Sequence, residues 1–138
     1  MLKKSLLLGG VSGILAGVAS IIYQKVYAAS LGVDFANIAK PQNIIIASLV
    51  TGLIAGTGYW LLTKWLKTKG EVIFNFLFTI LSFASIAGAF GAKLPFDVDM
   101  PELFPGLVVP MHFFPALAWF TLKPTFIKNA EPYRKVFA

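Results

Sequence analysis

The chain contains no cysteine, one histidine and only six acidic residues among 138. Without cysteine it can form no disulfide, no thiol nucleophile and no zinc–thiolate site. One histidine cannot complete an H-E-x-x-H zinc motif, and neither a phosphate-binding P-loop nor a G-x-S-x-G nucleophile elbow is present. These absences exclude the common soluble catalytic sites, and we expect no cofactor.

Charged residues are also scarce, at 13% of the chain against 57% hydrophobic residues. A soluble domain averages about 25% charged residues. The charges cluster and leave four long apolar runs, and about 20 such residues suffice to span a bilayer as a helix. We therefore predict one all-α membrane domain, residues 1–138, built as a four-helix bundle with up-down-up-down topology. The approximate spans are 5–28, 43–66, 71–92 and 105–123.

The net charge of +6 raises the question of nucleic-acid binding, but the positions of the basic residues answer it differently. With both termini in the cytoplasm, nine basic residues face the inside: Lys3, Lys4, Lys64, Lys67, Lys69, Lys123, Lys128, Arg134 and Lys135. Only Lys25, Lys40 and Lys93 face the outside. The positive-inside rule selects this orientation. We predict a multi-pass protein of the bacterial cytoplasmic (inner) membrane that contacts the lipid bilayer and binds no nucleic acid.

The first apolar run, from Ser5 to about Ala28, admits two interpretations. Lys3 and Lys4 before an apolar stretch fit a signal peptide, but the run exceeds the ~7–15 residues of such an h-region. We favour a spanning helix. Gly32 is expected to cap its C-terminus, and proline at position 41 suits the first turn of the next helix.

Small residues recur every four positions in the first two apolar runs, and this spacing lets helices approach closely in lipid. The helix-packing candidates are Gly9, Gly13, Gly17, Gly52 and Gly56. They could pack helices within the chain, or mediate contact with a homo-oligomer or membrane partner. Residues 13–17 and 52–56 are nearly the same pentapeptide, which leaves an internal repeat open.

Polar residues on one face of the third run, together with the lone histidine of the fourth, form a candidate polar pocket. Its members are His112, Asn75, Thr79, Ser82 and Ser85. An ionisable residue inside a membrane span is costly and usually faces the bundle interior. The stripe could line a wet path or only pack helices. His112 could bind a substrate, a water molecule, or the hydroxyl of Ser82 or Ser85.

The fourth run is the shortest. Residues 107–122 would measure about 24 Å as a helix, below the ~30 Å thickness of the hydrocarbon core. We expect one of two adjustments: the helix extends beyond the apolar run at both ends, or tilted neighbouring helices make the bilayer locally thinner. Pro110 and Pro115 lie inside it and are expected to kink or break it, because proline removes a helical hydrogen bond.

The predicted outer loops contain the acids Asp34, Asp97, Asp99 and Glu102. Carboxylates near His112 could hold a divalent cation or relay protons. However, the spacing of Asp99 and Glu102 also matches a helix capping box, which needs no ligand. We therefore predict no metal site.

Three features carry a resemblance: Leu31-Gly32-Val33-Asp34-Phe35, a glycine-rich second helix with a basic turn, and Met111-His112 at the start of the last helix. With them the chain resembles a family of small bacterial four-helix membrane proteins that has no assigned activity. The resemblance implies the same topology and draws attention to Asp34 and His112. The pair Phe113-Phe114 and the proline-rich outer loop depart from the family pattern.

Three classes of function remain, and we favour the first, a non-enzymatic protein of helix packing or assembly, which requires a dry bundle with buried glycine faces. The second is a small transporter or channel subunit, which requires a cavity that reaches His112. The third is a membrane enzyme that acts on a lipid or quinone at the outer leaflet. It requires Asp97 or Asp99 within hydrogen-bonding reach of His112.

Overall fold

The computed structural model describes residues 1–127, and no β-strand occurs among them. The helices are α1 (Leu2–Leu31), α2 (Pro41–Gly91), the 3₁₀ helix η1 (Pro101–Leu103) and α3 (Phe104–Phe126). By length and composition, α1, α2 and the η1–α3 segment could each cross a membrane. The prediction of an all-α chain is confirmed, and its three long helices are each long and apolar enough to span a membrane. The basic residues predicted at 128, 134 and 135 lie outside the described residues.

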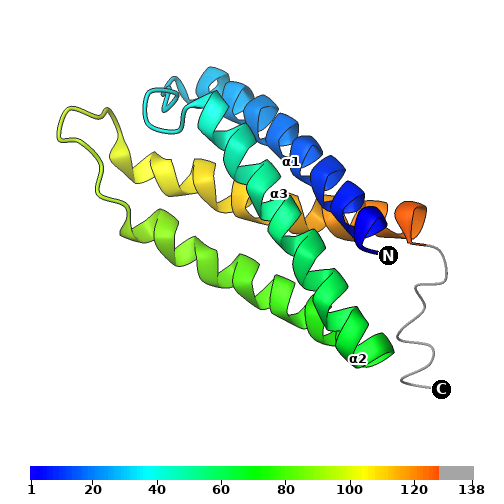
Figure 1. Cartoon of the computed structure of the whole chain (residues 1–138). Coiled ribbons are helices and arrows are strands. Elements are labelled where there is room, and N and C mark those ends of the chain that lie inside the picture. The colour runs from blue at the N-terminus through cyan, green and yellow to red at the C-terminus, as the bar shows by residue number, and fades with distance from the viewer. Residues whose placement is uncertain (128–138) are drawn as a thin grey trace.

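The longest helix, α2, is interrupted at Lys67, whose backbone is not helical (φ 51°, ψ −127°). The chain reverses there, and we call residues 41–66 the first arm and residues 68–91 the second arm of α2 (Figure 1). Gly70 permits the sharp return, because a Cβ at this position would overlap the carbonyl oxygen of Leu62. The predicted spans 43–66 and 71–92 correspond to these two arms, except that Ala92 lies just beyond the end of the second.

The bundle has two distinguishable ends (Figure 1). At the turn end lie the N-terminus, the Lys67 turn and the end of α3. At the loop end lie the connections 32–40 and 92–100. Each end has its own apolar core. The turn-end cluster comprises Leu8, Ala55, Tyr59, Phe74, Trp119 and Ile127. The loop-end cluster comprises Val33, Phe35, Phe104, Leu107 and Met111.

Two predicted helix boundaries are confirmed. Gly32 caps α1 in the left-handed conformation (φ 72°), and its N–H bonds the Ala28 carbonyl at 2.9 Å. Pro41 stands in the first turn of α2. The capping box predicted from Asp99 and Glu102 is wrong, because no side-chain hydrogen bond caps η1 or α3. The first helical turn instead begins with proline 101, whose fixed φ and missing N–H suit that position.

Helix α3 has 23 residues and extends beyond the predicted apolar run at both ends. It continues through Pro110, Pro115 and Pro124. Each proline lacks the N–H that would bond the carbonyl four residues earlier. Helix α1 supplies one replacement: the Tyr23 hydroxyl donates to the freed Gly106 carbonyl at 2.9 Å. The Tyr27 hydroxyl donates to the Leu103 carbonyl at 2.6 Å. These bonds dock α3 on α1.

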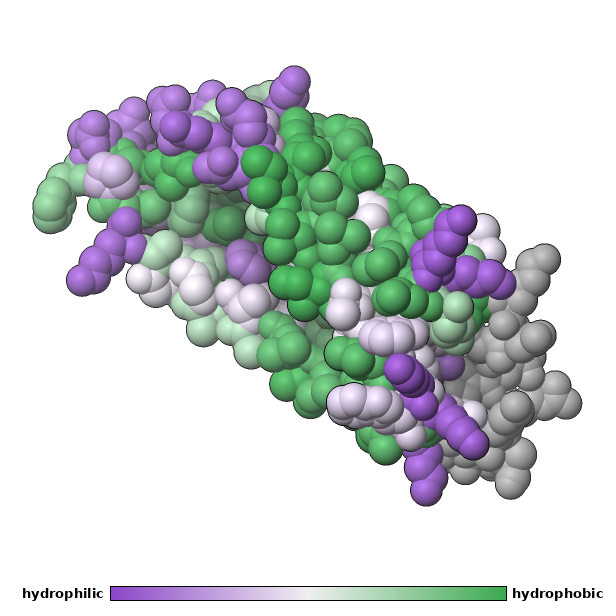
Figure 2. Space-filling model, viewed as in Figure 1, coloured by the Kyte–Doolittle hydropathy of each residue, from purple (hydrophilic) through white to green (hydrophobic). Residues whose placement is uncertain are grey.

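On the face that Figure 2 shows, the middle of the molecule is mostly apolar, and hydrophilic residues gather toward the two ends. Large apolar side chains are well exposed there, such as Ile54 at 67% and Leu81 at 63%. So much exposed apolar surface would be unfavourable in water. The distribution suits a multi-pass membrane protein, in which lipid covers the middle band.

Candidate functional site: a groove between the arms of α2

One face of the first arm is packed directly against α1 through glycine. A Cβ on Gly9 would overlap the Gly52 carbonyl oxygen, and a Cβ on Gly52 would overlap that of Gly9. A Cβ on Gly56 would lie 2.5 Å from the Ser5 carbonyl oxygen. The other predicted glycines, Gly13 and Gly17, also face the first arm. The backbones therefore touch within one chain, and a partner could reach these glycines only by displacing α1.

The other face of the first arm borders a cavity of about 510 Å³, which we call the arm groove. The first arm contributes small residues to one wall: Ala47, Thr51, Ala55 and Gly58. The second arm forms the opposite wall with Phe78, Leu81, Ser82 and Ser85, among others. Helix α3 adds Val108, Met111, His112 and Pro115. The volume lies within the range of about 300–1,000 Å³ that is typical of small-molecule sites.

The structure divides the predicted polar pocket. His112, Ser82 and Ser85 line the arm groove, whereas Asn75 and Thr79 are not part of its lining. Asn75 is buried, and Thr79 is exposed with its hydroxyl donating to the Asn75 carbonyl at 2.8 Å. The groove follows a neighbouring face of the second arm, through positions 74, 78, 81, 82 and 85. Counting three and four positions along the helix from Phe74 and Phe78 would have predicted this face.

His112 is held by its own helix. Its Nδ1 lies 2.7 Å from the Val108 carbonyl oxygen, which can only accept a hydrogen bond. Nδ1 therefore carries the proton, and in the neutral ring Nε2 presents a lone pair. The predicted bond from His112 to Ser82 or Ser85 is not formed. Those hydroxyls donate instead to the carbonyls of Phe78 and Ser82, at 2.8 and 2.7 Å.

The candidate acids Asp34, Asp97, Asp99 and Glu102 are exposed on the loops at the loop end. The Asp34 carboxylate accepts the Ala36 N–H at 2.8 Å, which is a local turn bond. Within residues 1–127, no group of three or more His, Cys, Asp or Glu side chains could hold a metal ion. The described residues that line the arm groove include no acid, so His112 has no carboxylate beside it there.

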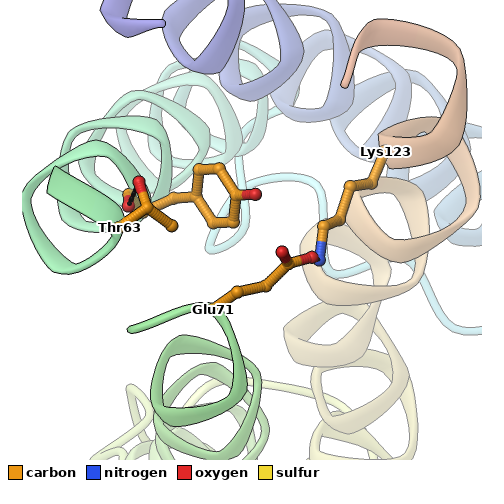
Figure 3. A network of polar contacts seen from close by, with 4 residues as sticks. Thr63, Glu71 and Lys123 are labelled. Atoms are coloured by element: carbon orange, nitrogen blue, oxygen red, sulfur yellow. Dashed lines mark hydrogen bonds and ion pairs between the residues drawn. The ribbon is translucent and has the colours of Figure 1, made fainter. Parts of the chain in front are cut away.

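Sequence reasoning missed an ion pair at the turn end, between Glu71 and Lys123 (Figure 3). Both side chains are only 9% exposed. The Tyr59 hydroxyl lies near the Glu71 carboxylate, and the Lys123 ammonium lies 5.3 Å from the centre of the Tyr59 ring. The sequence held one indication of this pair. Glu71 is an acid that directly follows Lys64, Lys67 and Lys69, in a segment predicted to lie on the same inner side of the membrane as Lys123.

This ion pair joins the start of the second arm to the end of α3. Next to it, the rings of Tyr59 and Phe74 lie 5.3 Å apart, and that of Trp119 lies 5.2 Å from Phe74. Trp119 is completely buried. The packed rings lie at the turn end beside the ion pair, and of them Phe74 lines the arm groove.

No protein-family model, curated protein or solved structure matches the chain. The resemblance to small four-helix membrane proteins therefore stays a prediction. Within the motif that carries it, Val33 and Phe35 are buried in the loop-end cluster, and Asp34 between them is exposed. The geometry of the arm groove is the basis for a functional proposal.

Proposed function

We propose that this protein is a non-enzymatic, four-span protein of the bacterial cytoplasmic membrane that holds an amphiphilic, membrane-dissolved molecule in the arm groove. In this proposal α1, each arm of α2, and α3 cross the bilayer in turn, up-down-up-down. Both termini and the Lys67 turn then lie in the cytoplasm.

The reversal at Lys67 supports four crossings, because each arm of α2 exceeds the ~20 residues that a span requires. The distribution of charge supports the orientation. Among the described residues, the turn end holds Lys3, Lys4, Lys64, Lys67, Lys69 and Lys123. The loop end holds Lys25, Lys40 and Lys93. The positive-inside rule therefore assigns the turn end to the cytoplasm.

The single observation that carries the binding proposal is the arm groove itself. It lies between helices whose exposed surface is apolar, so a molecule dissolved in the bilayer can enter from the side. Its lining is mostly hydrocarbon with a few polar atoms, the usual composition of a small-molecule site. His112 is the one titratable side chain among the described residues of the lining, which favours binding over acid–base chemistry.

Lipid that co-purifies with the protein tests this proposal. We expect mass spectrometry of detergent extracts to find one molecular class strongly enriched over the bulk membrane. Thr51→Phe, which fills the groove, should lose this enrichment. Thr57→Phe is the matched control, because Thr57 is exposed on the same arm and does not line the groove. A lipid profile equal to that of the bulk membrane in the wild-type protein would overturn the proposal.

The absence of cysteine makes the topology easy to test by single-cysteine labelling. In cells with a permeabilised outer membrane, an impermeant maleimide should label Asn37→Cys at the loop end. It should label Lys67→Cys at the turn only after the inner membrane is opened. The opposite pattern would contradict the orientation, and labelling of both sites in intact cells would contradict four spans.

A small transporter or channel subunit is the second candidate, because the cavity reaches His112 as that function requires. A continuous path would have to pass the turn end, where the rings of Tyr59, Phe74 and Trp119 are packed together. The closed turn end therefore favours a binding site with one entrance.

A further inference from the structure

On the side of the arm groove formed by α3 and the second arm, the polar side-chain atoms that remain available to an occupant are hydrogen-bond acceptors. Nδ1 of His112 donates to the Val108 carbonyl, and Nε2 has no partner among the described residues. In the neutral ring Nε2 is therefore a free acceptor on a side chain that lines the groove. An unpaired polar atom surrounded by hydrocarbon is costly, so an occupant that donates to it is favoured.

The two serines of the second arm add acceptors and no donors. A hydroxyl has one hydrogen, and those of Ser82 and Ser85 are already donated to carbonyls of their own helix. Only their lone pairs remain available to an occupant. On the opposite side, the hydroxyls of Ser20, Ser48 and Thr51 make no hydrogen bond to the described residues, so each can donate or accept.

This pattern separates the chemical classes that could occupy an apolar groove. A quinone or ester head offers only acceptors, so it could accept from Ser20, Ser48 or Thr51 but would leave Nε2 of His112 without a donor. A carboxylate or ammonium head would bring a charge, and no aspartate, glutamate, lysine or arginine occurs among the described residues of the lining. A hydroxyl is neutral, donates one hydrogen bond and accepts others, so it satisfies both walls.

We infer that the molecule held in the arm groove is a neutral lipid alcohol whose hydroxyl donates a hydrogen bond to Nε2 of His112. This inference rests on the proposed function and names the class of its ligand. His112 is the ninth residue of α3, about 12 Å along the helix from its start at the loop end. The hydroxyl would therefore lie below the membrane surface, where a charged head would be unfavourable.

Photolabelling in nanodiscs tests the inference with two matched probes. One is a diazirine-bearing hexadecanol, and the other is its methyl ether, which keeps the chain and loses the donor. One hydrogen bond contributes about 0.5–1.5 kcal/mol, so we expect the alcohol to label the groove about two- to twelvefold more strongly than the ether. His112→Leu should abolish the difference, and His112→Gln, which keeps an acceptor, should retain part of it. Thr79→Val is the control, because Thr79 is exposed on the second arm outside the groove.

Equal labelling of the wild-type groove by alcohol and ether would overturn the inference and leave the proposed function intact. Equal discrimination by wild type and His112→Leu would also overturn it, because the hydroxyl would then be recognised elsewhere. Labelling of the outer helix surfaces by both probes, with none in the groove, would contradict the proposed function itself. The wild-type comparison needs no substitution, so the test does not depend on whether a variant folds.

Discussion

The two faces of the first arm of α2 both carry small residues, yet one is closed and the other is open. Gly52 and Gly56 face α1, where a single added methyl group would overlap or crowd a backbone carbonyl. Ala55 and Gly58 face the second arm and border a cavity of about 510 Å³. Small residues at helical spacing therefore do not by themselves determine whether a face packs or leaves space.

The residues on the opposing helix make the difference. Gly52 meets Gly9, so both backbones can approach until they touch. Gly58 faces the ring of Phe74, whose nearest atom would lie 3.9 Å from an added Cβ. This ring packs against that of Tyr59 at the turn end, and the two arms diverge from there toward the loop end (Figure 1). The groove is lined by both arms and by α3.

The largest effect should come from the ion pair that fixes the narrow end of the groove. Lys123→Met leaves the Glu71 carboxylate buried without its partner, and removal of one member of a buried pair costs about 3–5 kcal/mol. We expect a loss of that size in reversible unfolding by SDS. The double variant Glu71→Leu/Lys123→Met should recover most of it, because no buried charge then remains. If the double variant instead lost the sum of the two single losses, Glu71 and Lys123 would not stabilise the turn end as a pair.

A matched pair of alanine substitutions tests the two faces directly. Gly52→Ala should destabilise the protein by about 1–3 kcal/mol, because the α1 and α2 backbones must separate to admit the methyl group. Gly58→Ala adds a methyl group at ordinary contact distance, and should stabilise the helix by up to about 1 kcal/mol. Equal effects in the same unfolding assay would refute the distinction between a closed and an open face.

The sequence sufficed for the features that depend on short-range patterns. The apolar runs predicted spanning helices, and Gly32 and Pro41 predicted helix ends, because these signals act within one or two turns. The face of a helix that lines a cavity depends on how neighbouring helices tilt. Thr79 was therefore assigned to the pocket with Ser82, although it is exposed outside it.

The ion pair shows a different limit. Glu71 and Lys123 are 52 positions apart in the chain, so no local spacing connects them. Each appeared to be a charge at a helix end, which is common near a membrane surface. Only the return of the second arm beside α3 brings them together. The capping-box prediction failed for the opposite reason, since the proline at 101 begins the turn without help from Asp99.

The smallest effect concerns α3, which forms the floor of the groove. Pro110 leaves the Gly106 carbonyl without its helical donor, and the Tyr23 hydroxyl replaces it at 2.9 Å. Tyr23→Phe should therefore cost about 1 kcal/mol in the SDS unfolding assay. The same substitution in a Pro110→Ala background should cost clearly less, because alanine restores the N–H. Thr57→Val, which removes an exposed hydroxyl bonded within its own helix, is the control. If Tyr23→Phe cost the same with and without Pro110, the tyrosine would stabilise α3 by packing alone, and the proline would not explain why α1 donates to this carbonyl.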